Sequence, residues 1–240
     1  MVERLATGIK GFDSLVDGGF PKGSITLVSG NPGTCKSIFC MQASFNISLK
    51  GVPVLYVSFE QKEDDLIDQL DQLGYKMAKT KGLLKFLNLQ PEDPQVMKKV
   101  LDEAKAMKAK MIIVDSLASL TSGPSKPEGQ NYTATQILDS VIPVPLDSES
   151  LSRMKVKMIF DAIKQTGATA LLTSEIIHGK DGFSRDTISE FLCDGIIMMD
   201  AVTLGKNLNR TIEVKKMRQT KIQGGKFDLQ FGKAGVEIGE

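Results

Sequence analysis

Residues 30–37 place the tightest limit on how this chain can fold, because they match the phosphate-binding loop pattern G-x-x-x-x-G-K-[ST] at every defined position but one. Cys35 stands where that pattern has its second glycine. A short apolar run, 24–29, precedes the loop, and the stretch from Ser37 to about Lys50 has the composition of an amphipathic helix. Strand, loop and helix in this order are the context that the motif requires. A Gly/Pro turn that precedes a helix by chance is the alternative, and the Lys-Ser pair in register disfavours it.

The loop residues have a defined chemical use in such a site. Successive backbone N–H groups converge on an anion, and the N-terminus of the following helix adds partial positive charge. Lys36 would reach the β- and γ-phosphates of a nucleotide, and the hydroxyl of Ser37 would bind Mg²⁺. The sequence therefore predicts a site for ATP and Mg²⁺. The residues expected to form its cradle are Gly30, Asn31, Pro32, Gly33, Thr34, Cys35, Lys36 and Ser37.

Cys35 departs from the pattern at a position where such loops commonly need a positive φ. A residue other than glycine adopts that conformation at a cost on the order of 1–2 kcal/mol, so we expect weakened nucleotide binding or lowered stability. Its place at a helix N-terminus beside Lys36 also predicts a lowered thiol pKa and faster alkylation than at Cys40 or Cys193.

Composition fits one large domain. The chain has 240 residues, of which 41% are apolar and 25% charged, so we expect a single α/β domain over residues 1–240 with a substantial core. A net charge of +1 does not by itself favour nucleic acid or an anionic membrane as a partner. No apolar run approaches the ~18 residues of a membrane helix, and the N-terminus lacks an apolar signal region, which favours a cytoplasmic location with no membrane partner.

Apolar runs of strand length alternate with helical patterns along most of the chain. Strands are expected near 25–29, 53–58, 84–89, 111–115 and 168–173, and helices near 37–50, 63–73, 94–107 and 149–166. This rhythm predicts a mostly parallel sheet with helices on both faces. Beyond residue 195, strand-like runs joined by glycine-containing turns predict an antiparallel extension at the C-terminal end. The segments 121–147 and 176–187 are expected to be loops.

Two carboxylates are expected at the same edge of this sheet. Asp115 ends the apolar strand 111–115, which is the form of a Walker B element and predicts a Mg²⁺ ligand; a helix cap or turn former is the alternative. Glu60 follows the strand 53–58 and suits a general base or a residue that positions the attacking water. The alternative for Glu60 is a solvated carboxylate in the first turn of a helix, since the acidic residues 63–65 follow it.

A basic cluster occupies residues 206–226, where seven Lys or Arg residues accompany a single acidic one. Strict strand alternation puts Lys216 and Arg218 on one face, which suits a single anionic target. The same alternation assigns Ile212 and Val214 to that face. The target would be nucleic acid or a nucleotide held by another subunit, and a solvated edge strand protected by lysines is the alternative.

Together these motifs resemble those of the KaiC-like branch of the RecA superfamily of P-loop ATPases over most of the chain. The segments 7–13 and 18–23 look like the family's lead-in to the phosphate loop. Phe59-Glu60-Gln61 is similar to the family's paired-glutamate motif with the second glutamate replaced. Residues 167–175 and 190–194 resemble the strand and following segment of that branch, and Lys216-Met217-Arg218 looks like its Lys-x-Arg pair.

The resemblance implies a RecA-like fold in a homo-oligomeric ring or filament, with a hexamer favoured and ATP between subunits. It assigns Glu60 to water activation and Thr173 to sensing of the γ-phosphate. It assigns Lys216 and Arg218 to the γ-phosphate of a neighbouring subunit's nucleotide. The loop 176–187 corresponds to the segment that faces DNA or the central pore in relatives, and its mixed charge leaves DNA contact open.

Three functions are compatible with the sequence. The first is a slow, Mg²⁺-dependent ATPase of a homo-oligomer. The second is a nucleotide-sensing regulatory module with little turnover, which the departures at Cys35 and Gln61 favour. The third is an accessory protein of DNA recombination or repair, which only the basic cluster and the family favour.

Overall fold

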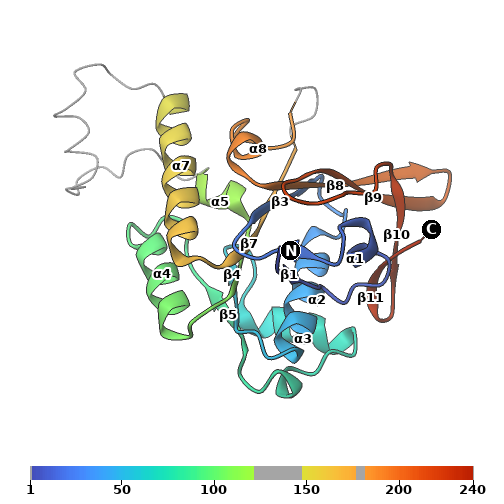
Figure 1. Cartoon of the computed structure of the whole chain (residues 1–240), viewed down its shortest axis with the longest axis horizontal. Coiled ribbons are helices and arrows are strands. Elements are labelled where there is room, and N and C mark those ends of the chain that lie inside the picture. Colours follow the sequence, from blue (N-terminus) through green and yellow to red (C-terminus); the bar gives the residue numbers. More distant parts are fainter. Residues whose placement is uncertain (1, 122–147, 177–181, 240) are drawn as a thin grey trace.

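The computed structural model describes residues 2–121, 148–176 and 182–239 (Figure 1). Their helices and strands are β1 (Arg4–Leu5), α1 (Phe12–Leu15), β2 (Phe20–Pro21), β3 (Ile25–Gly30), α2 (Lys36–Leu49), β4 (Val54–Ser58), α3 (Glu63–Gln72), the 3₁₀ helix η1 (Met77–Thr80), β5 (Leu84–Asn88), α4 (Val96–Ala106), β6 (Met111–Asp115), α5 (Leu117–Thr121), α7 (Ser148–Thr166), β7 (Thr169–Ser174), α8 (Ser189–Leu192), β8 (Gly195–Leu204), β9 (Asn207–Met217), β10 (Phe227–Gly232) and β11 (Gly235–Ile238).

Within the described residues, nine strands form one sheet in the order β11-β10-β9-β8-β3-β7-β6-β4-β5. The strands from β8 to β5 run parallel, whereas β9, β10 and β11 pair antiparallel on one side. A separate pair joins β1 to β2. The predicted mostly parallel sheet, with antiparallel strands at the C-terminal end, is confirmed.

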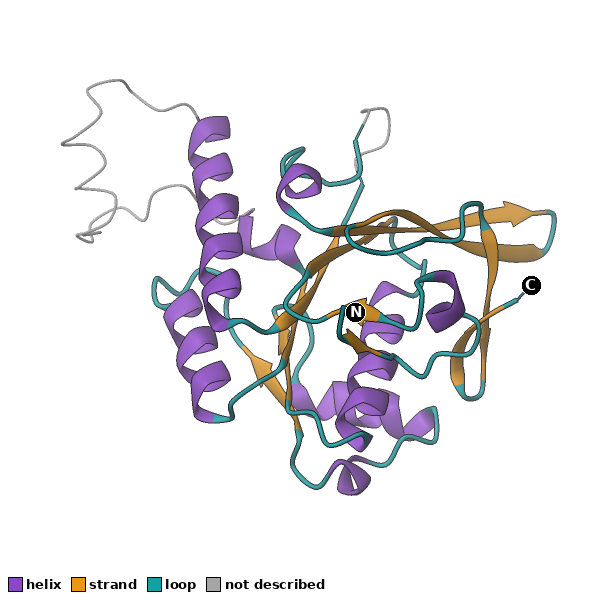
Figure 2. Cartoon of the chain, in the orientation of Figure 1, coloured by secondary structure: helices purple, strands orange, loops and turns teal. Residues whose placement is uncertain are grey.

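Helices cover both faces of the parallel part of the sheet (Figure 2). Four of its strands, β3, β4, β6 and β7, are buried along their whole length, as parallel strands covered on both sides must be. One core joins α2 and α3 to the sheet, and a second joins α4, α5 and α7 to it. Val28 belongs to the first core and its neighbour Leu27 to the second, as strand alternation requires.

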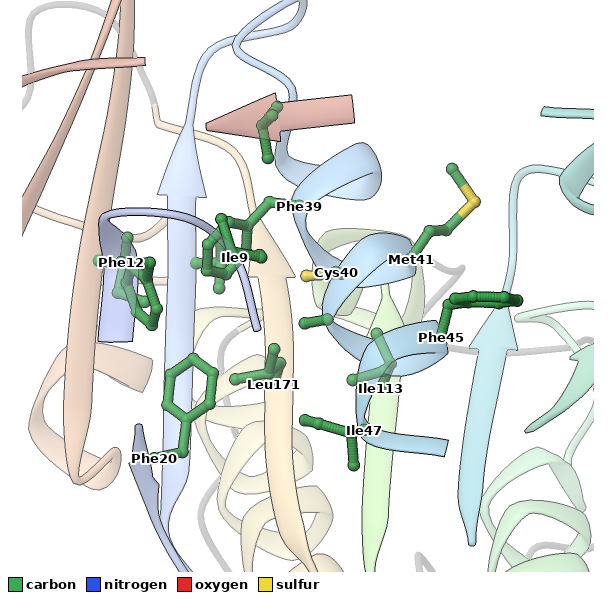
Figure 3. Packing of buried hydrophobic residues seen from close by; sticks show 14 of the residues in the cluster. Ile9, Phe12, Phe20, Phe39, Cys40, Met41, Phe45, Ile47, Ile113 and Leu171 are labelled. Atoms are coloured by element: carbon green, nitrogen blue, oxygen red, sulfur yellow. The ribbon is translucent and has the colours of Figure 1, made fainter. Parts of the chain in front are cut away.

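The first core holds α2 against the sheet (Figure 3). The rings of Phe12 and Phe39 meet edge to face with centroids 4.9 Å apart, and both side chains are fully buried. Burial of a large apolar side chain contributes roughly 1.5–3 kcal/mol, so these contacts stabilise the start of α2 beside the loop 30–37. Cys40 and Ile47 of the same helix pack in this core with Leu171 of β7.

A β-bulge in β9 changes the predicted facing of the basic cluster. Ile197 pairs with Val214 but Ile196 pairs with Lys216, so Lys215 is an extra residue in the ladder. The prediction that Lys216 shares a face with Ile212 and Val214 is therefore wrong, because one inserted residue reverses the alternation. Lys216 faces α8, whereas Arg218 lies just beyond the end of β9 and bonds to Asp194.

Of the predicted loop 121–147, only Thr121 is described, and it ends α5. Of the predicted loop 176–187, residues 177–181 lie outside the described residues, and the described remainder forms turns and bends without a helix or strand, as predicted. Within the described ranges, no helix is both long enough and apolar enough to cross a membrane.

Candidate active site

The carboxyl ends of β3, β7, β6 and β4 lie side by side at one edge of the sheet, because these strands are neighbours and run parallel. Register pairs Ser29 with Ser174, and Ser58 with Asp115. Ligands of open α/β sheets bind outside such an edge. The predicted site residues that meet here are the loop 30–37, Glu60, Asp115 and Thr173.

The loop 30–37 curls because residues of opposite backbone handedness alternate in it. Gly33 has φ 81° and Cys35 has φ 72°, with Thr34 between them, and this alternation turns successive N–H groups toward one point. The predicted positive φ of Cys35 is confirmed. Glycine is required at Gly30, since a Cβ there would come within 2.2 Å of the carbonyl oxygen of Met199.

Lys36 begins α2 and folds back over the loop. Its Nζ donates hydrogen bonds to the carbonyl oxygens of Gly30 at 2.8 Å and Asn31 at 3.1 Å. Burial lowers the pKa of Lys36 below the usual value for lysine, against the opposing charges of Glu175 and Asp115. The ammonium is thus held in a partly desolvated place, where an anion would be attracted more strongly than in water.

Asp115 is oriented by hydroxyl groups from both neighbouring strands. The phenol of Tyr56 on β4 donates to Oδ2 at 2.6 Å, and the hydroxyl of Thr173 on β7 donates to Oδ1 at 2.6 Å. Both donors are fully buried. The two hydroxyl groups therefore fix the orientation of the Asp115 carboxylate. The hydroxyl of Thr173, which we expected to sense a γ-phosphate, thus donates its hydrogen bond to Asp115 in this structure.

Glu60 lies beyond the end of β4, where two serines from the segment after β6 hold it. Ser116 Oγ donates to its Oε1 at 3.0 Å and Ser119 Oγ donates to the same atom at 3.2 Å. Ser58 Oγ accepts from the backbone N–H of Gln61 at 3.0 Å and supports the turn. Among the described residues no group donates to Oε2 of Glu60, so that oxygen can receive a further donor.

The lowered thiol pKa predicted for Cys35 is wrong. Desolvation by burial raises the pKa of Cys35, and this effect exceeds the opposing charges of Arg210 and Lys36. Sequence reasoning counted the helix N-terminus and Lys36 but not the packing of Cys35 against the first core, which depends on the fold.

Cys35 is nevertheless expected to be alkylated faster than Cys40 and Cys193, because it is partly exposed and they are buried. Burial raises the pKa of Cys193 to about 11 and that of Cys40 well above the usual range. Since the pKa of Cys35 is also raised, its alkylation should be slow near pH ~7 and should accelerate toward pH ~10. Mass spectrometry after iodoacetamide treatment measures this, and ATP should protect the thiol. A fast rate that does not change over this pH range would contradict the raised pKa.

Lys216 and Arg218 lie beside the amino ends of the parallel strands, whereas the loop 30–37 lies at their carboxyl ends. β9 runs antiparallel to β8, and its last residue, Met217, pairs with Gly195 at the start of β8. The amino ends of the parallel strands are at that edge. The structure therefore separates both cations from the phosphate loop of their own chain.

The two cations make different contacts there. Lys216 Nζ donates to the carbonyl oxygens of Cys193 at 2.7 Å and Glu190 at 3.2 Å, and so caps the end of α8. The side chain of Arg218 is 60% exposed and forms an ion pair with Asp194 at 3.3 Å. Arg218 is the cation more available to another molecule.

Sequence reasoning missed several residues that orient this site. Tyr56 holds Asp115, two serines hold Glu60, and the charge of Glu175 acts on Lys36. Two of these residues had a usable indication in the sequence. A buried tyrosine in an aliphatic strand needs a hydrogen-bond partner, and Glu175 follows a predicted strand in the same way as Glu60 does.

Comparisons with known proteins agree with this geometry. The family model described as "ATPase: KaiC" matches residues 5–240. Circadian clock oscillator protein KaiC from Synechococcus elongatus is 27% identical over 99% of this chain, and that from Thermostichus vulcanus is 28% identical over 99%. The chain spans 44% of the length of each of these relatives. The crystal structure of KaiC-like protein PH0186 from Pyrococcus horikoshii OT3 matches with a TM-score of 0.81 and 25% identity over the full length of both chains.

The resemblance inferred from the motifs is thus confirmed, and so is the fold that it implied. Since the family model covers nearly the whole sequence, this chain belongs to the KaiC family of RecA-like P-loop ATPases.

Proposed function

We propose that this chain is a Mg²⁺-dependent ATPase with slow turnover, whose residues 1–240 act as one ATPase domain. One observation carries the proposal: Lys36, Asp115 and Glu60 gather at the edge of the sheet where the loop 30–37 opens. They are a cation for phosphate, a carboxylate for a metal ion and a carboxylate for water, which is the set that phosphoryl transfer to water needs.

The residues present fit ATP and Mg²⁺. Within the described residues, no side chain caps the first turn of α2, so its N–H groups are available to phosphate oxygens. Ser37, in that turn, and Asp115 would hold Mg²⁺, which when bound would draw charge from the phosphate oxygens. Lys36 would exchange its two loop carbonyls for the β- and γ-phosphates. Glu60, with Oε1 held by two serines, would orient the attacking water through Oε2 and accept its proton.

We further propose a homo-oligomer, with a hexameric ring as the expected form and Arg218 completing the site of a neighbour. The distance of Arg218 from the loop 30–37 of its own chain supports this proposal. Arg210 bonds to that loop, and at about 3.3 Å per strand residue Arg218 lies roughly 25 Å farther along the chain. Phe191 on α8 is 73% exposed, between the two residues that bind Lys216. A large exposed aromatic side chain beside a cation is typical of a surface that a partner covers.

Tyr56→Phe is expected to raise the Mg²⁺ concentration needed for half-maximal turnover by about tenfold, because loss of a residue that orients a metal-binding carboxylate typically weakens metal binding by that much. The ring of Tyr56, 5.3 Å from that of Phe86, keeps its packing. Tyr75→Phe is the matched control, since its hydroxyl donates to Ala234, outside the site. An unchanged Mg²⁺ requirement in Tyr56→Phe would show that the phenol does not orient Asp115.

Two specific observations keep a nucleotide-sensing module with little turnover as the second candidate. Cys35 has left-handed backbone geometry that costs a non-glycine residue on the order of 1–2 kcal/mol, and Gln61 replaces the second glutamate of the paired motif. An accessory role on DNA has less support, because the basic cluster is divided between two edges of the sheet.

A phosphate-release assay with ATP and Mg²⁺, run with and without single-stranded DNA beside a measurement of mass in solution, tests the proposal. We expect slow release that depends on Mg²⁺, no stimulation by DNA, and a mass of several chains. Binding without release would favour the sensing module, and strong stimulation by DNA would favour the accessory role. Absence of both binding and release would refute the proposal.

A further inference from the structure

Arg210 reaches the phosphate loop of its own chain from a strand that is not adjacent to it. It lies on β9, directly across from Ala201 of β8, and β8 separates β9 from β3. Its Nε donates a hydrogen bond to the carbonyl oxygen of Gly33 at 2.9 Å. In the sequence, Arg210 is one of the seven basic residues of the cluster 206–226, and no motif marks it.

The charge of the same guanidinium also acts on the thiol of Cys35. One side chain therefore bonds to the first of the two loop residues with positive φ, Gly33, and acts electrostatically on the second, Cys35. These two residues define the curl that directs the N–H groups of the loop toward an anion.

We propose that Arg210 is a positioning residue, which holds the loop 30–37 in its phosphate-binding conformation and offsets the strain introduced by Cys35. A glycine at position 35 would adopt φ 72° without strain, and the loop would need no such support. With cysteine there, relaxation toward negative φ would uncurl the loop. The hydrogen bond from the planar, rigid guanidinium to Gly33, with its charge acting on the thiol of Cys35, opposes that movement.

The contacts distinguish this role from direct binding of phosphate. Arg210 donates to a carbonyl oxygen of the loop, whereas an anion would be bound by the N–H groups. A direct phosphate ligand would matter equally whichever residue stands at position 35. A positioning residue that offsets the strain of Cys35 would matter much less when that strain is absent. The inference rests on the proposed function only in taking the loop as the nucleotide site.

Amide hydrogen exchange tests whether Arg210 holds the conformation of the loop. It is measured on peptides covering residues 30–37 in the nucleotide-free full chain. Arg210→Ala should speed this exchange by about tenfold, because a hydrogen bond from a charged donor is lost. In the Cys35→Gly background, the same substitution should change it by less than about twofold. Lys215→Ala is the matched control, since it removes an equal charge from β9 at a residue paired with Glu213, away from the loop. Equal effects of Arg210→Ala in both backgrounds, or no effect in either, would overturn the proposal.

The affinity for ATP is the second quantity to measure in the same variants. Arg210→Ala should weaken ATP binding by about tenfold with Cys35 present and by less than about twofold with Cys35→Gly. Arg210→Lys should behave like Arg210→Ala, because a flexible ammonium lacks the planar guanidinium whose Nε binds the carbonyl oxygen of Gly33. Rescue by lysine, or equal loss in both backgrounds, would identify the residue as a charge for the nucleotide instead. If the unaltered chain binds no ATP, the proposed function fails, while the exchange measurement still decides whether Arg210 holds the loop.

Discussion

Replacing Lys36 by alanine is expected to weaken ATP binding by at least about 100-fold, since each charge-assisted hydrogen bond to phosphate contributes roughly 1.5–3 kcal/mol and the lysine would make more than one. In the structure the ammonium is partly buried beside the carbonyl oxygens of the loop, at 2.8 and 3.1 Å. Its removal also leaves Glu175, Asp115 and Glu60 without their shared cation, so these carboxylates would repel the phosphates.

Isothermal titration calorimetry with ATP and Mg²⁺ measures this loss, and Lys50→Ala provides a matched control. Lys50 lies at the other end of the same helix, where its Nζ donates to the carbonyl of Ala6. Affinity in Lys50→Ala should be unchanged. Chemical denaturation of both variants checks that each remains folded. If Lys36→Ala binds ATP as well as the unaltered chain does, the loop 30–37 is not the nucleotide site.

Most of the sheet could be predicted from the sequence because its strands and helices are long and strongly patterned. The strand predicted at 111–115 is β6 itself, and the helix expected near 149–166 is α7, Ser148–Thr166. Parallel strands buried on both faces read as unbroken apolar runs, and these are easy to recognise. Elements such as α1 and α8 have only four residues each, which is too few for a helical period to appear.

The loop 30–37 and Asp115 were predictable because each belongs to a contiguous motif whose chemistry depends on order along the chain. The bonds from Tyr56 to Asp115 and from Arg210 to Gly33 were not, because they depend on strand order and register, which a single sequence does not specify. The same limit explains the error over the facing of Lys216, since one extra residue in β9 reverses every side chain beyond it.

Arg218→Ala is expected to lower ATP turnover by a factor of ~10³ while leaving the affinity for ATP nearly unchanged, as loss of an arginine that acts in trans does. The side chain is 60% exposed, and its ion pair with the partly buried Asp194 is 3.3 Å long, so its removal should cost little stability. Lys216→Ala should instead destabilise α8, because the ammonium binds two carbonyl oxygens there. Thermal unfolding of both variants separates the two effects.

Mixed oligomers test the central claim of a shared active site most directly. In a co-expressed equal mixture of Arg218→Ala and Glu60→Gln chains, a site regains both groups when the first chain holds the nucleotide and the second supplies the arginine. Random assembly makes about one quarter of the sites complete, so turnover should recover to about a quarter of the unaltered level. A double variant carrying both substitutions, mixed with Arg218→Ala chains, should stay inactive. Recovery with the first mixture and none with the second is the predicted result; no recovery in either, in oligomers that mass spectrometry shows to contain both chains, would contradict the account.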